Sequence, residues 1–360
     1  MAKTIKWLER YKEHRKLEET VKLFRHNAIP SVDEFIDHVG RVYRSIMRRR
    51  KGLQGRIELE IRRLDAVYAE TKVYLKRIAR LPTLSEMPLF HRLLVELFVG
   101  KDYDKAIAKA RKALKIISRI YSDYRLLVIT SRNPKEAAKL RREACGRILS
   151  VVRRLAKNIE LVRKVRMEII KTHVVTEGLA VVVVAGPPNA GKSTLVRLLS
   201  TAKPEVASYP FTTKTIIVGK VEHQGTSFYL VDTPGILEED PDKLSTIERK
   251  ALITILALAD IVLFLLDPAS ELLTLEEQVS RLKKLLNLVH SIDRKIDVEV
   301  ALNKIDLLDD EELAKTRNFL AKVLPVDTSR LHMISAEKAL GIEELVKDLT
   351  YKARMILFGG

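Results

Sequence analysis

The nine residues 186–194, GPPNAGKST, constrain this chain more than any other stretch. They follow the apolar run 181–185 and precede an apolar-periodic segment, which predicts a loop between a buried strand and a helix. The loop fits G-x-x-x-x-G-K-[ST], in which backbone N–H groups and the N-terminus of the following helix bind phosphate. Lys192 is expected to reach the β- and γ-phosphates of a nucleoside triphosphate, and Ser193 to ligate Mg²⁺. The other nucleotide contacts expected from this loop are Asn189, Ala190, Gly191 and Thr194.

A second motif, DTPG at residues 232–235, follows the apolar run 228–231 and begins 40 residues after Lys192. An Asp at the end of such a strand can hold Mg²⁺, usually through water, so Asp232 is the next expected magnesium ligand. The backbone N–H of Gly235 is expected to meet the γ-phosphate. D-x-x-G alone is common in turns, but its place after the phosphate loop makes it specific.

The sequence NKID at residues 303–306 ends another apolar strand and indicates guanine. The Asp306 carboxylate can accept hydrogen bonds from N1–H and the exocyclic amino group of guanine, and adenine offers neither donor there. We expect Lys304 to pack over the base and Asn303 to tie neighbouring loops together. The backbone N–H groups of Ser335–Ala336 are expected to bind guanine O6. The expected ligand is therefore GTP or GDP.

The segment 208–214, SYPFTTK, is predicted to be a switch that closes on GTP and releases on hydrolysis. Thr213 is expected to contact Mg²⁺ and the γ-phosphate, and Thr212 is the alternative residue for this role. The segment could instead be an ordinary Thr-rich turn with no switch function. Ile236 stands where many GTPases have a glutamine that orients the attacking water, so intrinsic hydrolysis is expected to be slow. The residues expected to act in catalysis are Lys192, Thr213, Gly235 and Asn189.

Asn189 leaves two interpretations open. Its place in G-x-x-N-x-G-K-S is similar to the loop of potassium-activated GTPases, so its side-chain oxygen can hold K⁺ near the phosphates; alternatively it only braces the loop. No general base is assigned. Histidines such as His91, His173 and His332 show no metal-ligand spacing.

The chain divides by periodicity into residues 1–170 and 171–360. The first part is predicted to be an all-α antiparallel helical bundle, and the second an α/β P-loop domain with a mostly parallel six-stranded sheet. The strands are expected at 179–185, 215–221, 227–231, 261–266, 298–302 and 331–334. Further helices are expected after the phosphate loop and at 243–258, 272–289, 311–323 and 342–355.

Local signals support the helices. A helix is expected at about residues 103–121, and a longer one along a stripe from Ile148 to Val162. Ser31 followed by Glu34 is typical of a helix N-terminus, as is the acidic run 309–312. The expected breaks are Pro82, Pro88 and Pro134.

Positive charge is concentrated before the phosphate loop. Residues 1–170 hold 42 basic and 20 acidic side chains, a net of +22, whereas residues 171–360 carry a net of −4. This asymmetry indicates a polyanionic partner for the first domain, nucleic acid or an anionic membrane, although any single cluster can be a solvated helix face. No aromatic stacking platform is evident, which favours structured RNA bound by shape and phosphates. The clusters are Arg41, Arg44 and Arg48–Lys51; Lys72, Lys76, Arg77 and Arg80; and Arg147, Arg153, Arg154 and Lys157.

Several longer stretches resemble a known family. YPFTT at 209–213 and DTPGIL at 232–237 are similar to the Obg branch of translation-factor-type GTPases. The segments LPTLSEMPLFHRLL (81–94), KDYDKA (101–106), LRREACGR (140–147) and TIE (246–248) resemble the nucleolar GTP-binding protein family. The resemblance spans nearly the whole chain and implies a GTPase that joins large ribosomal subunit assembly through ribosomal RNA.

The resemblance also has a departure. Nucleolar members carry a long basic C-terminal extension, whereas this sequence stops with the GTPase domain and resembles a short archaeal-type form. A second hypothesis for the slow hydrolysis, beside K⁺, is activation by the pre-ribosome itself.

Composition limits the alternatives. Cys145 is the only cysteine, so no intrachain disulfide can form and no disulfide-linked partner is expected. The first residues lack the pattern of a signal peptide and no apolar run reaches the length of a membrane span, so we expect a cytoplasmic protein without membrane contact. Two alternatives remain: a membrane-targeting GTPase whose basic helices contact anionic lipid, and a basic RNA-binding protein with a degenerate nucleotide site.

Overall fold

The computed structural model describes residues 2–47, 51–172, 178–208, 215–232, 246–292, 294–325 and 331–358. The chain forms two compact units. The helical unit comprises Lys22–Met87 and Phe98–Ile170, and the sheet unit comprises Met1–Val21, Pro88–Leu97 and Lys171–Gly360.

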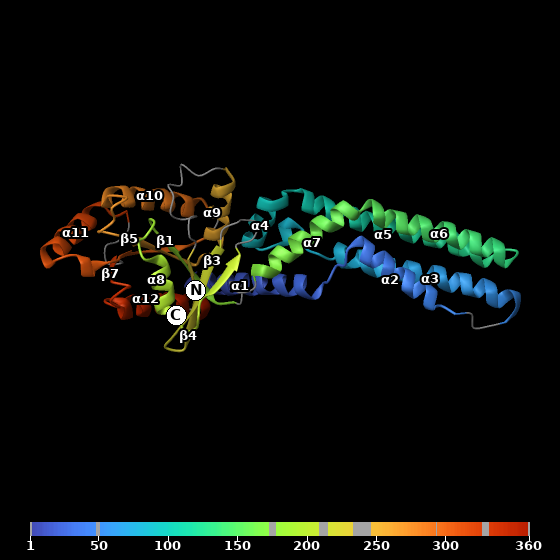
Figure 1. The fold of residues 1–360 in the computed structure, drawn as a ribbon, viewed down its shortest axis with the longest axis horizontal. Helices are drawn as coiled ribbons and strands as arrows, with labels where there is room; N and C mark the ends of the chain where they lie inside the picture. Colours follow the sequence, from blue (N-terminus) through green and yellow to red (C-terminus); the bar gives the residue numbers. More distant parts are fainter. Residues whose placement is uncertain are drawn as a thin grey trace. The chain divides into compact units, whose positions relative to one another are not determined.

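The helical unit is built from long antiparallel helices, as predicted (Figure 1). Tyr68 stacks on Tyr121 with ring centroids 3.9 Å apart, and Asp65, one turn earlier, pairs with Arg125, one turn later, at 3.1 Å. This opposite progression shows that the two helices carrying these residues run in opposite directions. The helices are α2 (Val32–Ser45), α3 (Gly52–Ala79), α5 (Asp102–Ile129), α6 (Pro134–Arg154) and α7 (Ala156–Lys171), with the short η1 (Leu84–Glu86) after α3.

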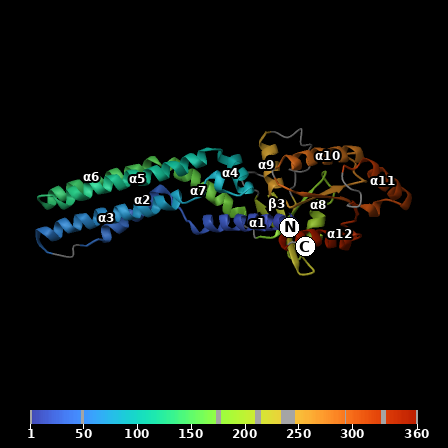
Figure 2. The same cartoon turned by 180° about the vertical axis from the view of Figure 1, so that it is seen from behind.

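The predicted helix signals of this unit are confirmed, with one difference. Ser31 and Glu34 form a reciprocal capping box at the start of α2. Asn133 caps α6, and Pro134 is its first residue. The stripe from Ile148 to Val162 does not lie on one helix, because the chain breaks between α6 and α7 at Leu155. α5 and α6 lie side by side in both views (Figure 2).

The sheet unit contains a seven-stranded sheet of order β2-β3-β4-β1-β5-β6-β7. The pairs β1–β4, β1–β5, β5–β6 and β6–β7 are parallel, and β2–β3 and β3–β4 are antiparallel. The strands are β1 (Ala180–Ala185), β2 (Glu205–Ser208), β3 (Thr215–His223), β4 (Thr226–Asp232), β5 (Ile261–Leu266), β6 (Asp297–Leu302) and β7 (Leu331–Met333). The six predicted strands are therefore present to within two residues at each end, and the edge strand β2 is additional.

Helices cover both faces of the sheet (Figure 1). Val181 and Val183 of β1 face α9, α10 and α11, whereas Val182 and Val184 face α8 and α12. Burial on both faces explains why β1 is a continuous apolar run rather than an alternating one. These helices are α8 (Lys192–Leu199), α9 (Thr246–Leu258), α10 (Leu275–Ser291), α11 (Asp310–Val323) and α12 (Ile342–Phe358), with the short η3 (Ile305–Leu307) after β6.

Two segments that precede the phosphate loop by many residues pack in the sheet unit. Leu17 of α1 (Ala2–His26) and Phe90 of α4 (Leu89–Val99) belong to the apolar cluster beside β1. His14 lies 3.0 Å from the buried carboxylate of Asp260, at the start of β5. The predicted division at residues 170 and 171 assigns the first part of α1 and most of α4 to the helical domain, whereas both pack in the sheet unit. No described helix is long and apolar enough to cross a membrane.

Candidate functional site

The phosphate loop connects β1 to α8 and requires glycine at two places. Gly186 has φ +146°, and a Cβ there would lie 2.5 Å from the carbonyl oxygen of Leu265. Gly191 has φ +88°, and a Cβ there would collide with the side-chain amide of Asn303. Asn189 also has a left-handed backbone, with φ +61°, which Asn tolerates better than most residues. Backbone strain and close packing therefore fix the curl of this loop.

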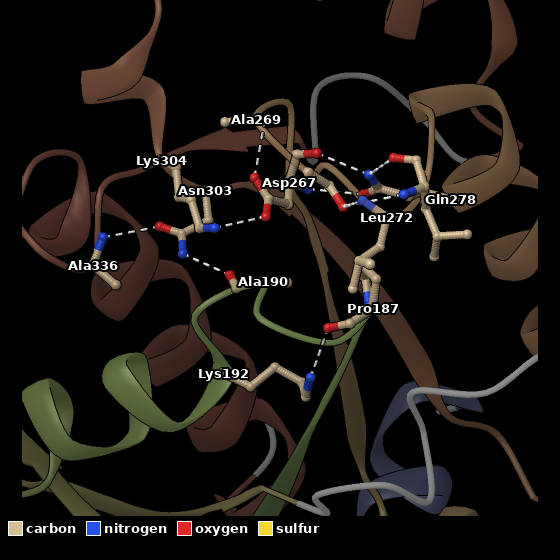
Figure 3. A network of polar contacts seen from close by, with 12 residues as sticks. Pro187, Ala190, Lys192, Asp267, Ala269, Leu272, Gln278, Asn303, Lys304 and Ala336 are labelled. Carbon is tan, nitrogen blue, oxygen red and sulfur yellow. Dashed lines mark hydrogen bonds and ion pairs between the residues drawn. The ribbon is translucent and has the colours of Figure 1, made fainter.

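Lys192 is 4% exposed and turns back into the loop (Figure 3). Its Nζ donates to the carbonyl oxygens of Pro187 at 2.8 Å and Gly186 at 3.3 Å. The ammonium is thus held against the inner side of the loop, at the N-terminus of α8, where both the charge and the helix dipole favour an anion.

Ser193 and Asp232 lie together at the end of β4. The Ser193 hydroxyl donates to Oδ2 of Asp232, whose side chain is fully buried. The register of the parallel pair β1–β4 sets Asp232 opposite Val184, next to the start of the phosphate loop. A hydroxyl and a carboxylate are the hard oxygen ligands that Mg²⁺ prefers, so this donor set fits that ion.

Asn303, at the end of β6, connects three loops (Figure 3). Its Nδ2 donates to Ala190 O at 2.8 Å, and its Oδ1 accepts from Ala336 N–H at 2.9 Å. The side chain is 2% exposed, so both hydrogen bonds are protected from water. Asn303 therefore fixes the distance between the phosphate loop and the loop that follows β7.

Lys304 belongs to a buried polar network that sequence reasoning missed (Figure 3). Lys304 has φ +61°, and its Nζ donates to Oδ2 of Asp267 at 2.7 Å. Asp267 is 1% exposed, and its backbone N–H and C=O both bond to the Gln278 amide at 2.8 Å. The sequence does contain a signal for this network, because Asp267 directly follows the apolar run 261–266. Neighbouring parallel strands end at the same edge of the sheet, so Asp267 could be expected near Lys304.

Asp306, in η3, presents an acceptor that the protein leaves open. Its Oδ1 is removed from solvent and accepts no hydrogen bond from any described residue. A buried acceptor without a partner is costly, and a donor supplied by a ligand would remove that cost. This is the arrangement expected of a carboxylate that recognises a base edge.

The amides predicted to bind guanine O6 are engaged within the protein. Ser335 N–H donates to Leu340 O at 3.0 Å, and Ala336 N–H donates to Asn303 Oδ1. A base contact from Ala336 would therefore have to share its N–H with Asn303.

Some predicted residues lie outside the part of the chain that the structure describes: Thr212, Thr213, Gly235 and Ile236, as well as His173. Asn189 is exposed at the loop tip, and Thr194 is half-buried in the first turn of α8.

The structure also brings His332 together with Glu299 and Asp348, which its sequence spacing did not indicate. Lys352 Nζ contacts Glu299 and lies 3.0 Å from Asp348. His332, whose Nε2 lies 3.4 Å from Oδ2 of Asp348, lowers the pKa of that carboxyl, and Lys352 adds to the effect. The lysine already supplies a countercharge to these carboxylates, so the cluster fastens α12 to β6 and β7.

The two parts of the chain match different families. Residues 24–175 match the NOG1 N-terminal helical domain, and residues 181–304 match the 50S ribosome-binding GTPase family. The uncharacterized protein MJ1408 of Methanocaldococcus jannaschii is 35% identical over 71% of this chain and 70% of that protein. Nucleolar GTP-binding protein 1 of Saccharomyces cerevisiae is 27% identical over 66% of this chain but only 36% of that protein. A solved nucleolar GTP-binding protein 1 from Plasmodium falciparum is 23% identical and covers 50% of this chain and 86% of that one, with TM-score 0.39.

Three features on one sheet define the class of this protein: the phosphate loop, the Ser193–Asp232 pair and the Asn-Lys-x-Asp loop. It is a P-loop GTPase that binds guanine nucleotides. Within that class, the NOG1 helical domain and the similarity to nucleolar GTP-binding protein 1 identify the family: the chain belongs to the nucleolar GTP-binding protein family.

Proposed function

We propose that this protein is a GTP-dependent switch that binds ribosomal RNA in precursors of the large ribosomal subunit and acts in their assembly. One observation carries the proposal: residues 1–170 hold a net charge of +22, whereas the part with the nucleotide motifs is at −4. The basic residues 1–170 attract a polyanion, and the part with the nucleotide motifs binds GTP or GDP. The match of residues 181–304 to the 50S ribosome-binding GTPase family supports a ribosomal partner. A cytoplasmic location is part of the proposal.

At the phosphate end of the site, the loop backbone and Lys192 bind the β- and γ-phosphates. Lys192 Nζ now donates to two loop carbonyls, and a phosphate oxygen would replace at least one of them. Ser193 and Asp232 would hold Mg²⁺, which supplies charge neutralisation on the phosphates when bound.

At the base end, the open oxygen of Asp306 accepts from guanine N1–H or its amino group. The Lys304 stem packs over the base while its ammonium stays on Asp267. Asn303 holds these loops at a fixed distance from the phosphate loop. Adenine would leave the buried acceptor of Asp306 unsatisfied, which accounts for discrimination against it.

Hydrolysis depends on residues of the two switches. Thr213, with Thr212 as the alternative, closes on the γ-phosphate, and Gly235 N–H meets it. Ile236 cannot orient water, so intrinsic turnover is slow and requires help. Two sources of help are K⁺ held by Asn189 and contact with the pre-ribosome; purified large-subunit particles should then raise turnover.

The partner is tested by co-sedimentation of the full chain with purified large ribosomal subunits and, separately, with anionic liposomes. We expect retention on subunits that changes between a non-hydrolysable GTP analogue and GDP, and little retention on liposomes. Lys192→Ala should remove the nucleotide response because the phosphate contact is lost. Retention on liposomes and not on subunits would contradict the proposal and favour the membrane-targeting alternative.

A further inference from the structure

A single face of α6 carries four cations along its length. Successive positions on this face, three or four residues apart, are Lys135, Lys139, Arg142, Gly146, Ser150 and Arg153. At about 100° per residue, these six positions lie within roughly 40° of Gly146 around the helix. We name this row the α6 stripe.

The α6 stripe faces solvent. The four cations and Gly146 are exposed, and Ser150 is half-buried. The opposite face of α6 is packed, since Ala144 and Ile148 are fully buried there. Arg141, which lies toward that packed face, is held by Glu60 at 2.7 Å. Among the described residues no carboxylate pairs with the four stripe cations, so their charge is available to a partner.

Two other exposed helix faces in this unit, on α5 and α2, are mixed in charge. On α5, the face that contains Lys112 and Arg119 also carries Ile116 and Asp123. On α2, the face that contains Gly40 carries Asp33 and Arg44. Of these three faces, only the α6 stripe combines four cations with no acidic residue, so among them it attracts phosphates most strongly.

Gly146 has no structural reason to be glycine. It lies in the interior of α6, where glycine destabilises a helix relative to alanine, and its backbone is not left-handed. A Cβ there would meet no atom within 4 Å. The absence of a side chain at the middle of a cationic row instead allows another backbone to approach the helix closely.

We propose that the α6 stripe is the surface on which this protein binds the sugar–phosphate backbone of double-helical RNA, with the strand crossing α6 at Gly146. Lys135 and Arg153 are 18 residues apart, so the stripe is about 27 Å long at the helical rise of 1.5 Å per residue. A duplex presents phosphates over such a distance, and it is read by shape and phosphate contacts. The stripe has no aromatic side chain on which unpaired bases could stack, which disfavours single strands. The inference rests on the proposed function, because it names where the RNA binds.

The test measures the affinity of the GDP-bound chain of residues 1–360 for a labelled 24-base-pair RNA of arbitrary sequence over a series of KCl concentrations. Arg142→Gln is expected to weaken duplex binding about fivefold and to reduce the slope of log affinity against log salt by about 1. The matched control is Arg119→Gln on the mixed face of α5, which should bind like wild type.

The second pair of variants tests the close approach. Gly146→Gln adds no charge and should not lower the thermal unfolding temperature, because Gln favours helix more than Gly. It is nevertheless expected to weaken duplex binding at least as much as Arg142→Gln. Its control is Gly40→Gln, since Gly40 also lies inside a helix with no atom near its Cβ position. Gly40→Gln should leave binding unchanged.

The outcomes separate the two claims. If wild type binds duplex RNA, and Arg142→Gln and Gly146→Gln bind it as tightly as wild type does, the α6 stripe is not the binding surface. The claim that the protein binds RNA then still stands. If wild type binds neither the duplex nor large subunits, both claims are overturned. Preference for the single strand of the same sequence, or for phosphatidylserine vesicles, overturns the stripe as a duplex surface.

Discussion

The Nζ group of Lys304 donates to Oδ2 of Asp267 at 2.7 Å, and this pair joins the guanine loop after β6 to the end of β5. The position of the Asp267 carboxylate is fixed by hydrogen bonds other than the one to Lys304. Its other oxygen accepts from Ala269 N–H at 3.0 Å, and Gln278 holds its backbone. The lysine is 29% exposed while its partner is 1% exposed, so the carboxylate sets the path of the lysine side chain.

Asp267→Asn is therefore expected to weaken GDP binding about tenfold. The change keeps an oxygen for Ala269 N–H but removes the buried countercharge of Lys304, and a hydrogen bond to a charged group contributes about 1.5–3 kcal/mol. Titration with a fluorescent GDP measures the effect. Asp297→Asn is the control, because that carboxylate lies 3.9 Å from the exposed Lys295. A dissociation constant within twofold of wild type for Asp267→Asn contradicts this role.

Asp306→Asn should change which base the site prefers. An asparagine offers an N–H₂ donor where the carboxylate offered only acceptors, so it suits the 2-oxo group of xanthine rather than the 2-amino group of guanine. We expect GDP affinity to fall by about 100-fold, equivalent to about 2.7 kcal/mol, and xanthosine diphosphate affinity to rise. Competition binding with the two diphosphates measures both. An unchanged preference for guanine would show that Asp306 does not read the base.

The sequence predicts the central strands well, because β1 and β5 are runs of apolar residues buried on both faces of the parallel part of the sheet. It does not predict β2, since Glu205–Ser208 has only four residues and lies at the sheet edge, where less burial is required. The break at Leu155 was missed for a different reason. Apolar residues continue at helical spacing through it, and Leu155 itself is buried.

The network around the guanine loop was predicted in part. Motifs identify Asn303, Lys304 and Asp306, but Asp267 becomes visible only when β5 and β6 are known to be neighbours. Periodicity likewise shows that Leu17 and Phe90 face a core but not which core, and both pack beside β1. Pairings between distant segments depend on topology, which a pattern in one segment does not contain.

His91 makes stability depend on pH. It is completely buried beside Thr172, and burial lowers the pKa of its imidazole to about 3 from 6.5. Its folded pKa is below the unfolded value, so the protein loses stability as pH falls from 6.5 toward 3. Between pH 7 and pH 5, this histidine should reduce the free energy of unfolding by about 2 kcal/mol.

Urea unfolding of wild type and His91→Gln at the two pH values measures that difference. The variant is expected to lose about 2 kcal/mol less than wild type between pH 7 and pH 5. His290→Gln, at the exposed end of α10, is the control and should behave like wild type. Equal losses in all three proteins would contradict the effect of burial on His91.

Potassium dependence follows from the proposed role of Asn189. Turnover of GTP is expected to be several-fold faster in KCl than in NaCl at equal ionic strength. Asn189→Gly keeps the left-handed backbone at φ +61° but removes the side-chain oxygen, so it should abolish the difference. Equal rates of the wild type in the two salts would leave Asn189 as a brace for the loop.

The central claim is that the guanine nucleotide controls how tightly the protein binds the large ribosomal subunit. The direct measurement is the dissociation constant for purified large subunits, with the protein loaded with a non-hydrolysable GTP analogue or with GDP. We predict a ratio of at least about tenfold between the two states, a coupling of about 1.4 kcal/mol. Equal dissociation constants in the two states would contradict the account.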